Sequence, residues 1–525
     1  DACELQLSLV VLDATHTPDP TSSPRSARPV ILLVLDGVRP DVLKSAIEEG
    51  AAPTLGALAQ KGEAAWDAVS VFPSITPAAT AAIATGEPPA GSGIVGHSWY
   101  DREADLPVIY GAMRETVISS GPLKVLDNNV WRMNRDHLSA PTIFERLHEQ
   151  GIEGSCVNFP IRRGPYTHPV RLKSVERVSK AGDYLGESVD GPREYYMGDL
   201  FHSRRSESNG REGTGGIMQS AGINDEHAAD VGARLLREGA APFNLLYFFK
   251  GDSITHHKGI GAQRRWIERA DGYVARAFEA AGGVERVLED YAVLALSDHG
   301  HSPLIDDAKQ SRHADLNSAL PEATLISPRS RLRGKDDILI LPNGRAAFIY
   351  LGDRRKPEPL AERLISERGL GLAAWRENGG VRVRSQGAEL YFRRVRGADG
   401  AVDASGGLWE IDGDLGALDM SLSGKEIEYG EYPDALNRLW GGLGSARTGE
   451  LVLSAKPGYT FGEISGSYHK ASDHGSLHAS DSNIFALASG VSAPRRITDV
   501  APILLAHFAG ASAGAAGANA RLIGS

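Results

Sequence analysis

Pro29-Val30-Ile31-Leu32-Leu33-Val34-Leu35 leads directly into Asp36-Gly37, and this stretch decides the fold. The run is apolar without alternation, which predicts a strand buried on both faces of a parallel sheet. Asp36 then stands at the carboxyl end of that strand, where ligand sites form in open α/β sheets. Because Asp-Gly is also a common turn, Asp36 alone does not establish a site.

The segments that follow alternate between helical and strand patterns. Helices are expected over 40–49 and 53–60, followed by a strand over 65–72. Farther along, the pattern predicts helices over 142–150, 224–237 and 262–281 and strands over 154–159, 243–249 and 291–296. Strands that alternate with helices form parallel sheets through βαβ units. We therefore expect an α/β protein with a mostly parallel sheet flanked by helices.

Thr76 offers a hydroxyl at the start of a helix. Pro77 suits the first helical position and disfavours helical geometry at Thr76, which predicts Thr76 as the N-cap. The free N–H groups and partial positive charge at that end favour a tetrahedral anion beside the hydroxyl. Threonine is also a common cap, so partners elsewhere in the chain must decide between capping and chemistry.

Two later strands end in acidic residues with histidine close behind. Strand 243–249 is followed by Asp252 and His256, whose spacing of four would place them on one helical face. Strand 291–296 is followed by Asp298-His299. We expect these side chains to meet Asp36, because the carboxyl ends of parallel strands lie at one edge of the sheet.

Composition limits the kind of ligand. The formal net charge of -11 argues against a nucleic-acid polymer as partner, since that needs a concentrated basic surface. Cys3 and Cys156 are the two cysteines, too few for a thiolate cluster, so histidines and carboxylates must hold any metal. The apolar run near the start is far shorter than the roughly 20 residues of a transmembrane helix.

In order and spacing, these motifs resemble the alkaline phosphatase superfamily, more closely its nucleotide pyrophosphatase/phosphodiesterase-like branch. The resemblance rests on Leu35-Asp36-Gly37, Phe72-Pro73-x-x-Thr76, the segment 93–101, Asp252-x-x-x-His256-x-x-Gly259 and Ser297-Asp298-His299-Gly300. It covers most of residues 29–302 and 465–508. It implies an alkaline-phosphatase-like fold, a small-molecule phosphoester substrate and a periplasmic or secreted location, although no complete signal peptide is visible.

The resemblance also implies two Zn²⁺ per chain. The residues that match the ligands of one ion are Asp36, Thr76, Asp298 and His299, and those that match the other are Asp252, His256 and a C-terminal histidine. For that histidine, His474 fits better than His469 or His478, because Gly475 follows it and Asp481 and a strand over 483–487 come next. Thr76 would attack phosphorus and form a phospho-threonine, so the configuration at phosphorus would be retained overall.

Two positions bear on the type of ester. Phosphomonoesterases that resemble this chain tend to have Asn where His97 stands, and a Lys-x-Arg pair where segment 159–164 supplies Arg163 without a lysine. A dianionic monoester gains more from each fixed cation than a diester does. We therefore expect phosphodiester or nucleotide pyrophosphate bonds as substrates, with phosphomonoester or phosphonate hydrolysis as the alternative. His97 and Arg163 are candidate substrate-binding residues, although Arg163 also fits a solvated surface arginine.

Related families fit less well. A sulfatase would carry its nucleophile in a Cys/Ser-x-Pro-x-Arg context, and Ser74-Ile75-Thr76-Pro77-Ala78 lacks the arginine. A cofactor-independent phosphoglycerate mutase would use a serine. A non-catalytic descendant would not need a full ligand set together with a nucleophile.

Four regions are expected along the chain. The catalytic core comprises 29–302 and 461–510, and the insertion 303–460 would cap the metal face, with a strand over 451–454 returning to the main sheet. A flexible lead-in over 1–28 and a flexible tail over 511–525 complete the chain.

Overall fold

A computed structural model describes residues 27–111, 122–170, 188–198, 201–202, 224–306, 312–314, 316, 320, 325–327, 330–397, 400–462, 469 and 471–510. Residues 1–26 of the expected lead-in and the expected tail, 511–525, lie outside this part of the chain.

An eight-stranded sheet forms one half of the molecule, with strand order β2-β25-β11-β1-β10-β5-β8-β9. Its strands are β1 (Val30–Leu35), β2 (Glu63–Val69), β5 (Gly154–Val157), β8 (Glu194–Met197), β9 (Phe201–His202), β10 (Phe243–Phe248), β11 (Ala292–Leu296) and β25 (Asn483–Ser489). The five strands from β11 to β8 are parallel, and β25 and β9 pair antiparallel beside them. The expected mostly parallel sheet is confirmed.

Helices cover both faces of this sheet, which is why β1 is apolar at every position. Val30, Leu32 and Val34 belong to one buried cluster, and the residues between them belong to the other. The helices on one face are α1 (Pro40–Glu48), α2 (Pro53–Lys61), α9 (Asp225–Arg237), α11 (Ile260–Ala280) and α12 (Val284–Asp290). Those on the other face are α3 (Thr76–Thr85), α7 (Ile143–Glu149) and α16 (Val500–Phe508).

An eleven-stranded, mainly antiparallel sheet forms the other half. Its strands are β13 (Leu325–Ile326), β14 (Ile338–Asn343), β15 (Ala346–Leu351), β16 (Leu370–Glu377), β17 (Gly380–Ser385), β18 (Ala388–Arg394), β19 (Ala401–Val402), β20 (Leu408–Gly413), β21 (Met420–Ser423), β22 (Glu426–Tyr429) and β23 (Leu451–Ala455). β23 was expected in the main sheet, but it pairs with β15 and β16. Its apolar residues are buried between these two partners.

Shorter elements complete the described fold. They are α4 (Pro89–Ser92), β3 (Ser98–Asp101), β4 (Leu106–Ile109), α6 (Pro122–Asp127), a π-helix over Asn128–His137, β6 (Tyr166–Pro169), β7 (Ser188–Gly191), α10 (Lys250–Lys258), β12 (Ser302–Pro303), α13 (Pro357–Leu364), α14 (Ala435–Leu443), β24 (Ser472–Asp473), α15 (Ala479–Ser482) and 3₁₀ turns over Leu415–Leu418 and Ile497–Asp499. None of the described helices has the length and apolarity to cross a membrane.

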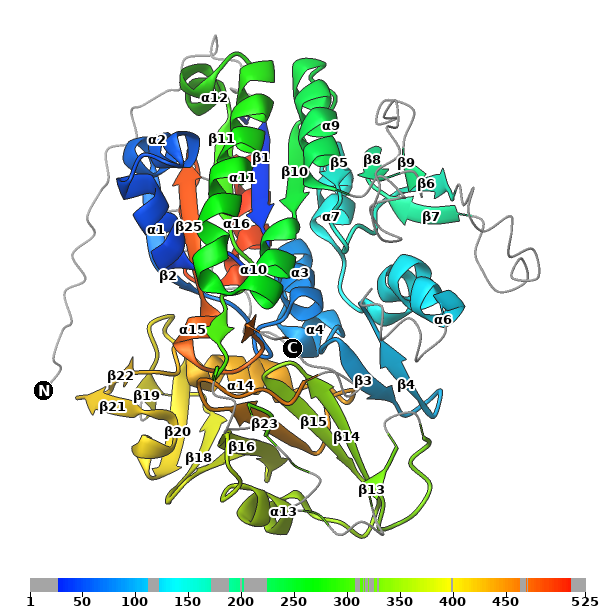
Figure 1. The fold of residues 1–525 in the computed structure, drawn as a ribbon, viewed down its shortest axis with the longest axis vertical. Helices are drawn as coiled ribbons and strands as arrows, with labels where there is room; N and C mark the ends of the chain where they lie inside the picture. Colours follow the sequence, from blue (N-terminus) through cyan, green and yellow to red (C-terminus); the bar gives the residue numbers. More distant parts are fainter. Residues whose placement is uncertain are drawn as a thin grey trace, which may run out of the picture.

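The two sheets meet at the carboxyl ends of the parallel strands. Figure 1 shows β1 and β10 pointing toward the second sheet, with α3, α10 and α15 between the two halves. Asn343 at the end of β14 exchanges two 2.9 Å hydrogen bonds with the backbone of Ser98. One hydrophobic cluster contains Leu32 of β1 together with Phe348 of β15, so both halves share a core. The expected site therefore lies at their junction.

Candidate metal centre and active site

Helix α3 presents the hydroxyl of Thr76. The structure places the N-cap at Ile75 with no side-chain cap, so Thr76 is the first helical residue and not the expected cap. The first intrahelical bond runs from Ala79 N–H to Ile75 O at 2.9 Å. Thr76 Oγ1 instead lies 3.1 Å from Nε2 of His299. The hydroxyl is thus directed at a candidate ligand at the positive end of a helix.

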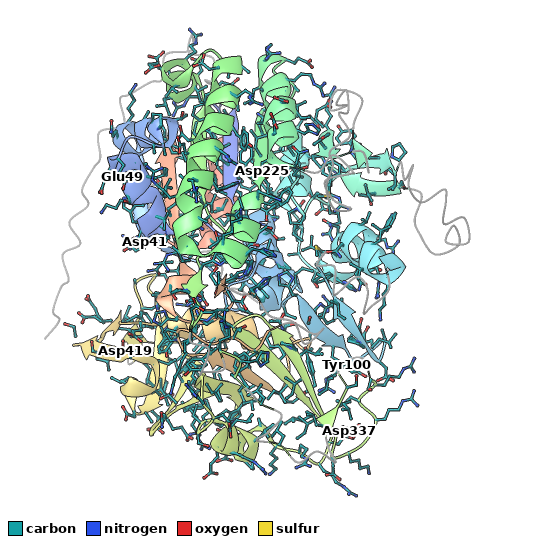
Figure 2. The ribbon with its side chains drawn as sticks, viewed as in Figure 1. Asp41, Glu49, Tyr100, Asp225, Asp337 and Asp419 are labelled. Carbon is teal, nitrogen blue, oxygen red and sulfur yellow. The ribbon has the colours of Figure 1, made fainter. Side chains whose placement is uncertain are left out.

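Helix α10 carries Asp252 and His256 one turn apart, as their spacing predicts. The buried carboxylate of Asp225, labelled in Figure 2, fixes the start of this helix. It accepts hydrogen bonds from the backbone N–H groups of Phe249 and Lys250 at 3.0 and 3.2 Å. Burial outweighs these bonds and raises the pKa of Asp225 to about 6.

Three imidazoles surround one carboxylate oxygen. Asp252 Oδ1 lies 3.1 Å from His256 Nε2, 3.0 Å from His301 Nε2 and 3.3 Å from His474 Nε2. The Nε2 atoms of His256 and His474 lie 3.1 Å apart. The three histidines are buried, whereas about 20% of the Asp252 side chain is exposed. Access from solvent is therefore on the Asp252 side.

The ring orientations follow from backbone contacts. Nδ1 lies 2.9 Å from a carbonyl oxygen in His256, 3.0 Å in His299 and 3.0 Å in His474. A carbonyl can only accept, so in each neutral ring Nδ1 carries the hydrogen and Nε2 presents a lone pair to the cluster. Anchoring of this kind is typical of histidines that bind metal.

A second group adjoins the first at the ends of β1 and β11. His299 Nε2 lies 3.4 Å from Asp36 Oδ1 and 3.5 Å from Asp298 Oδ2. The other oxygen of Asp298 accepts N–H bonds from Gly37 and His299, both at 3.0 Å. The other oxygen of Asp36 accepts a short bond from Tyr247 OH. Each carboxylate therefore has one oxygen fixed by the protein and one directed into the cluster.

The donor set fits metal ions. Four buried atoms of the described cluster have no hydrogen-bond partner, namely Asp36 Oδ1, Asp252 Oδ1, Asp298 Oδ2 and His301 Nε2. A buried polar atom without a partner is costly, and divalent cations would satisfy these acceptors. Nitrogen and oxygen ligands without thiolate suit zinc.

The pKa directions show how strongly the groups interact. Burial raises the pKa of Asp36, and the neighbouring Asp298 and Asp252 raise it further. Burial acts to lower the pKa of His474, but Asp252 outweighs it and raises that pKa to about 9. For His299, burial and then His474 lower the pKa to about 3. The negative carboxylates thus attract positive charge into the cluster.

The structure brings together the predicted Asp36, Thr76, Asp252, His256, Asp298, His299 and His474. Burial and then His474, with a smaller contribution from His299, lower the pKa of His97 to about 3, so His97 is within electrostatic reach of the cluster. His478 is placed elsewhere, with Nδ1 2.9 Å from Ser480 Oγ.

Arg163 is directed away from the cluster. Its Nε and Nη2 donate to Glu145 at 2.8 and 3.2 Å, and its remaining N–H groups reach carbonyl oxygens of Asn134, Leu138 and Ala140 at 2.8–3.0 Å. All five guanidinium hydrogens are therefore used within the protein. Arg163 therefore has no N–H group left to bind a substrate phosphate.

Sequence reasoning did not assign His301, Tyr247 or the pair His469 and Asp473. His301 could have been suspected, since residues two apart in an extended segment face the same side and His299 precedes it. Tyr247 needs the β1–β10 register, which sets it beside Val34. His469 stacks on His256 with centroids 3.5 Å apart, and these two with Asp473 form a further group of possible ligands.

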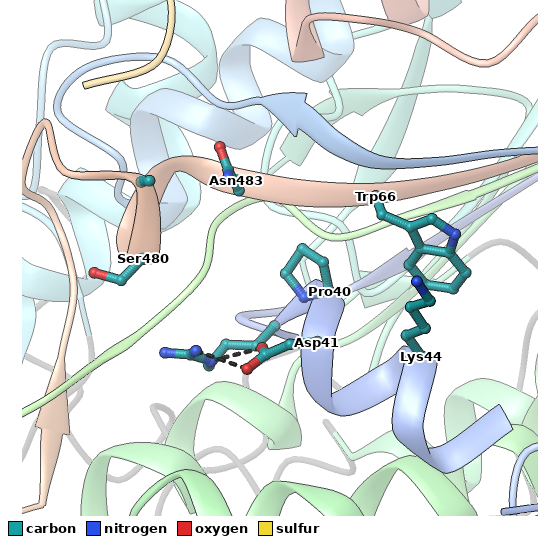
Figure 3. Close-up of a pocket in the computed structure, with 8 residues that line it drawn as sticks. Pro40, Asp41, Lys44, Trp66, Ser480 and Asn483 are labelled. Carbon is teal, nitrogen blue, oxygen red and sulfur yellow. Dashed lines mark hydrogen bonds and ion pairs between the residues drawn. The ribbon is translucent and has the colours of Figure 1, made fainter. Parts of the chain in front are cut away.

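A surface pocket of about 350 Å³ is lined by Arg39, Pro40, Asp41, Lys44, Trp66, Ala479, Ser480 and Asn483. Figure 3 draws the ion pair between Arg39 and Asp41, 2.8 Å long. Arg39 Nη1 also donates to the backbone carbonyl of His301 at 2.7 Å. The pocket wall thus anchors the loop that carries His301.

Comparison with known proteins gives a family match. The family described as type I phosphodiesterase/nucleotide pyrophosphatase matches residues 30–477. Among solved structures, murine ectonucleotide pyrophosphatase/phosphodiesterase 5 is similar with a TM-score of 0.54 and 13% identity, over 92% of this chain and 95% of that one. Phosphonoacetate hydrolase from Sinorhizobium meliloti 1021 in complex with phosphonoacetate has a TM-score of 0.51 and 18% identity, over 93% and 96%. These likenesses concern the fold. Comparison with curated sequences gives no match.

Proposed function

The chain belongs to the type I phosphodiesterase/nucleotide pyrophosphatase family, and from that premise we propose that it is a two-zinc hydrolase of phosphodiester or nucleotide pyrophosphate bonds with Thr76 as nucleophile. One observation carries the proposal: the Thr76 hydroxyl makes no helix cap and lies 3.1 Å from His299 within the acidic and histidine-rich cluster. In the murine relative, a threonine-to-alanine variant in complex with AMP is described as inactive. We also propose the periplasmic or secreted location that the resemblance implies.

The proposed ligands are Asp36, Thr76, Asp298 and His299 for one zinc ion and Asp252, His256 and His474 for the other. Bound zinc would lower the pKa of the Thr76 hydroxyl and stabilise the charge that develops during phosphoryl transfer. Thr76 Oγ1 would form a bond to phosphorus while the bond to the leaving oxygen breaks. Water would then displace Thr76 from the phospho-threonine, so two inversions give overall retention.

The surroundings of the cluster support a diester over a monoester. Arg163 is the fixed cation suggested by the sequence, but all five of its N–H groups donate to Glu145 and to backbone carbonyl oxygens. A dianionic monoester would lose more from the absence of this cation than a diester. His97, whose lowered pKa keeps it neutral at neutral pH, would contribute a hydrogen bond but no positive charge.

The test compares kcat/KM of the zinc-loaded protein for p-nitrophenyl phosphate, bis-p-nitrophenyl phosphate and p-nitrophenyl-TMP. We expect the two diesters to be preferred. A monoester preference of roughly a hundredfold or more would contradict the proposed bond type while leaving the nucleophile assignment open to separate test. Phosphonoacetate belongs in the same series, because a hydrolase of that compound shares the fold. Hydrolysis of phosphonoacetate alone would replace the diesterase proposal.

A further inference from the structure

We propose that His301 is an additional protein ligand of the ion at Asp252, which gives this site four protein ligands: Asp252, His256, His301 and His474. The inference rests on the proposed metal-dependent function and deepens it, since the family resemblance implies only the other three. His301 lies two residues beyond His299, and its ring is fully buried.

The hydrogen bonds of His301 leave Nε2 as the free nitrogen. Nδ1 lies 3.3 Å from Ser472 Oγ, and that hydroxyl donates its hydrogen to Thr255 O at 2.7 Å. Ser472 Oγ can therefore only accept from Nδ1–H, which leaves a lone pair on Nε2. This lone pair faces Asp252 Oδ1 at 3.0 Å, a contact between two acceptors that a cation would relieve.

Four of the six distances among these four atoms are close to those around one tetrahedral ion. Zinc bonds of about 2.0–2.1 Å in a tetrahedron place neighbouring ligand atoms about 3.3–3.4 Å apart. The distances from Asp252 Oδ1 to the three histidine nitrogens are 3.0–3.3 Å, and His256 and His474 lie 3.1 Å apart. All four atoms lie within 4.8 Å of one another. Small outward shifts would accommodate one ion among them.

Neighbouring groups hold His301 in this position. Arg39 donates to its carbonyl oxygen at 2.7 Å. Gly37 has a φ of +67°, and a Cβ there would lie 2.7 Å from His301 Nε2. The turn after β1 therefore leaves just enough room for the imidazole beside Asp252. These contacts fix His301 at the cluster.

A fourth protein ligand changes what the site can do. Catalytic zinc sites usually have three protein ligands and one open position, whereas four ligands close a tetrahedron. The ion at Asp252 would accordingly be retained strongly, and the substrate would approach from the exposed Asp252 side. This predicts slow metal loss from one of the two positions.

The test titrates metal-free protein with Co²⁺ and records the visible absorption, which reports the number and geometry of the ligands. The Zn²⁺ affinity is measured separately by competition with a chelator. In His301→Ala we expect the absorption spectrum of one of the two bound Co²⁺ ions to change. We also expect Zn²⁺ to bind at that position more than about a hundredfold more weakly. This loss exceeds the one usual for a residue that only hydrogen-bonds to a metal ligand. His257→Ala is the matched control, because His257 is exposed next to His256 with Nδ1 2.7 Å from Ser253 O.

Circular dichroism checks that each variant folds. If His301→Ala does not fold, His301→Gln, which keeps most of the side-chain volume, carries the same comparison. An unchanged Co²⁺ spectrum in a folded His301 variant would overturn the proposal, whatever the affinity. If the wild-type protein itself binds no Co²⁺ or Zn²⁺, the proposed metal-dependent function fails as well, so the two failures are distinguishable.

Discussion

Thr76 Oγ1 contacts Nε2 of His299 at 3.1 Å, and α3 begins without using that hydroxyl as a cap. Removing the hydroxyl should therefore affect chemistry more than folding. We expect Thr76→Ala to lower kcat/KM at least about a thousandfold, as for other lost nucleophiles, while metal content and melting temperature stay close to wild type.

Thr85→Ala is the control for this prediction. It makes the same substitution at the far end of α3, where the hydroxyl donates to Ala81 O at 2.6 Å. Steady-state kinetics and metal analysis compare the two variants. Retention of more than a few per cent of activity by Thr76→Ala would move the nucleophile to another hydroxyl, such as Ser74 or Thr80.

Residue types and spacing predicted much of the cluster because each ligand motif ends a strand or starts a helix. Asp36, Asp298 and His299 could be placed by that rule alone. The contacts of Arg163 could not be predicted in this way, because they involve Glu145 in α7 and carbonyl oxygens of the preceding loop. His301 was missed for a similar reason: its partner Asp252 is distant in sequence and meets it only after the sheet has formed.

At the scale of elements, the turn between β1 and α1 limits how close the backbone can come to the cluster. Gly37 and Gly50 both have left-handed φ, +67° and +74°, so alanine costs backbone strain of about 1–2 kcal/mol at either. A Cβ at Gly37 would in addition lie 2.7 Å from His301 Nε2, whereas a Cβ at Gly50 meets nothing within 4 Å.

We expect Gly37→Ala to lower the free energy of unfolding by more than Gly50→Ala and to lower metal content, which Gly50→Ala should leave unchanged. Urea denaturation and metal analysis measure the two effects. Equal losses of stability with unchanged metal content in both variants would show that the contact with His301 is relieved without cost.

The parallel strands were predicted well, whereas the sheet to which β23 belongs was predicted wrongly. Continuous apolar runs such as β1 identify strands covered on both faces, and their ends matched to within a few residues. In the second sheet the pairing of β23 is decided by distant partners, β15 and β16. A short apolar segment of this kind fits either sheet, because strand preference depends on its neighbours.

On the scale of the whole molecule, a buried ion pair joins the two halves. Arg345 lies between β14 and β15 of the second sheet and bonds Asp481 of α15 at 2.6 Å, and both side chains are fully buried. Burial acts to raise the pKa of Asp481, but Arg345 and hydrogen bonds from Ser302 and Ser476 lower it to about 2. The stabilisation is therefore present above the unfolded pKa near 4 and is lost as the pH falls through about 2.

Asp481→Asn should accordingly cost about 3–5 kcal/mol of unfolding free energy at pH 7, because it leaves Arg345 buried without its counter-charge. The difference from wild type should shrink as the pH falls from about 4 toward 2. Glu410→Gln, in the exposed Arg393–Glu410 pair, is the control and should cost under about 1 kcal/mol. A pH-independent difference would mean that the charge of Asp481 contributes nothing.

Metal removal tests the molecule as a unit, because the proposed ligands come from α3, α10 and the loops after β1, β11 and β24. The second sheet also contacts this centre, since the backbone N–H of Arg345 donates to His474 O at 2.8 Å. Ions that bind only the folded protein stabilise it by about 2.7 kcal/mol per site at free ion 100 times Kd. Chelation should therefore abolish turnover and lower the melting temperature, measured by calorimetry. Zinc should restore both better than magnesium, because magnesium prefers six oxygen ligands and this cluster offers several imidazole nitrogens. Full recovery with magnesium alone would contradict the nitrogen-rich centre, whereas recovery of stability without turnover would place the metals in a structural role.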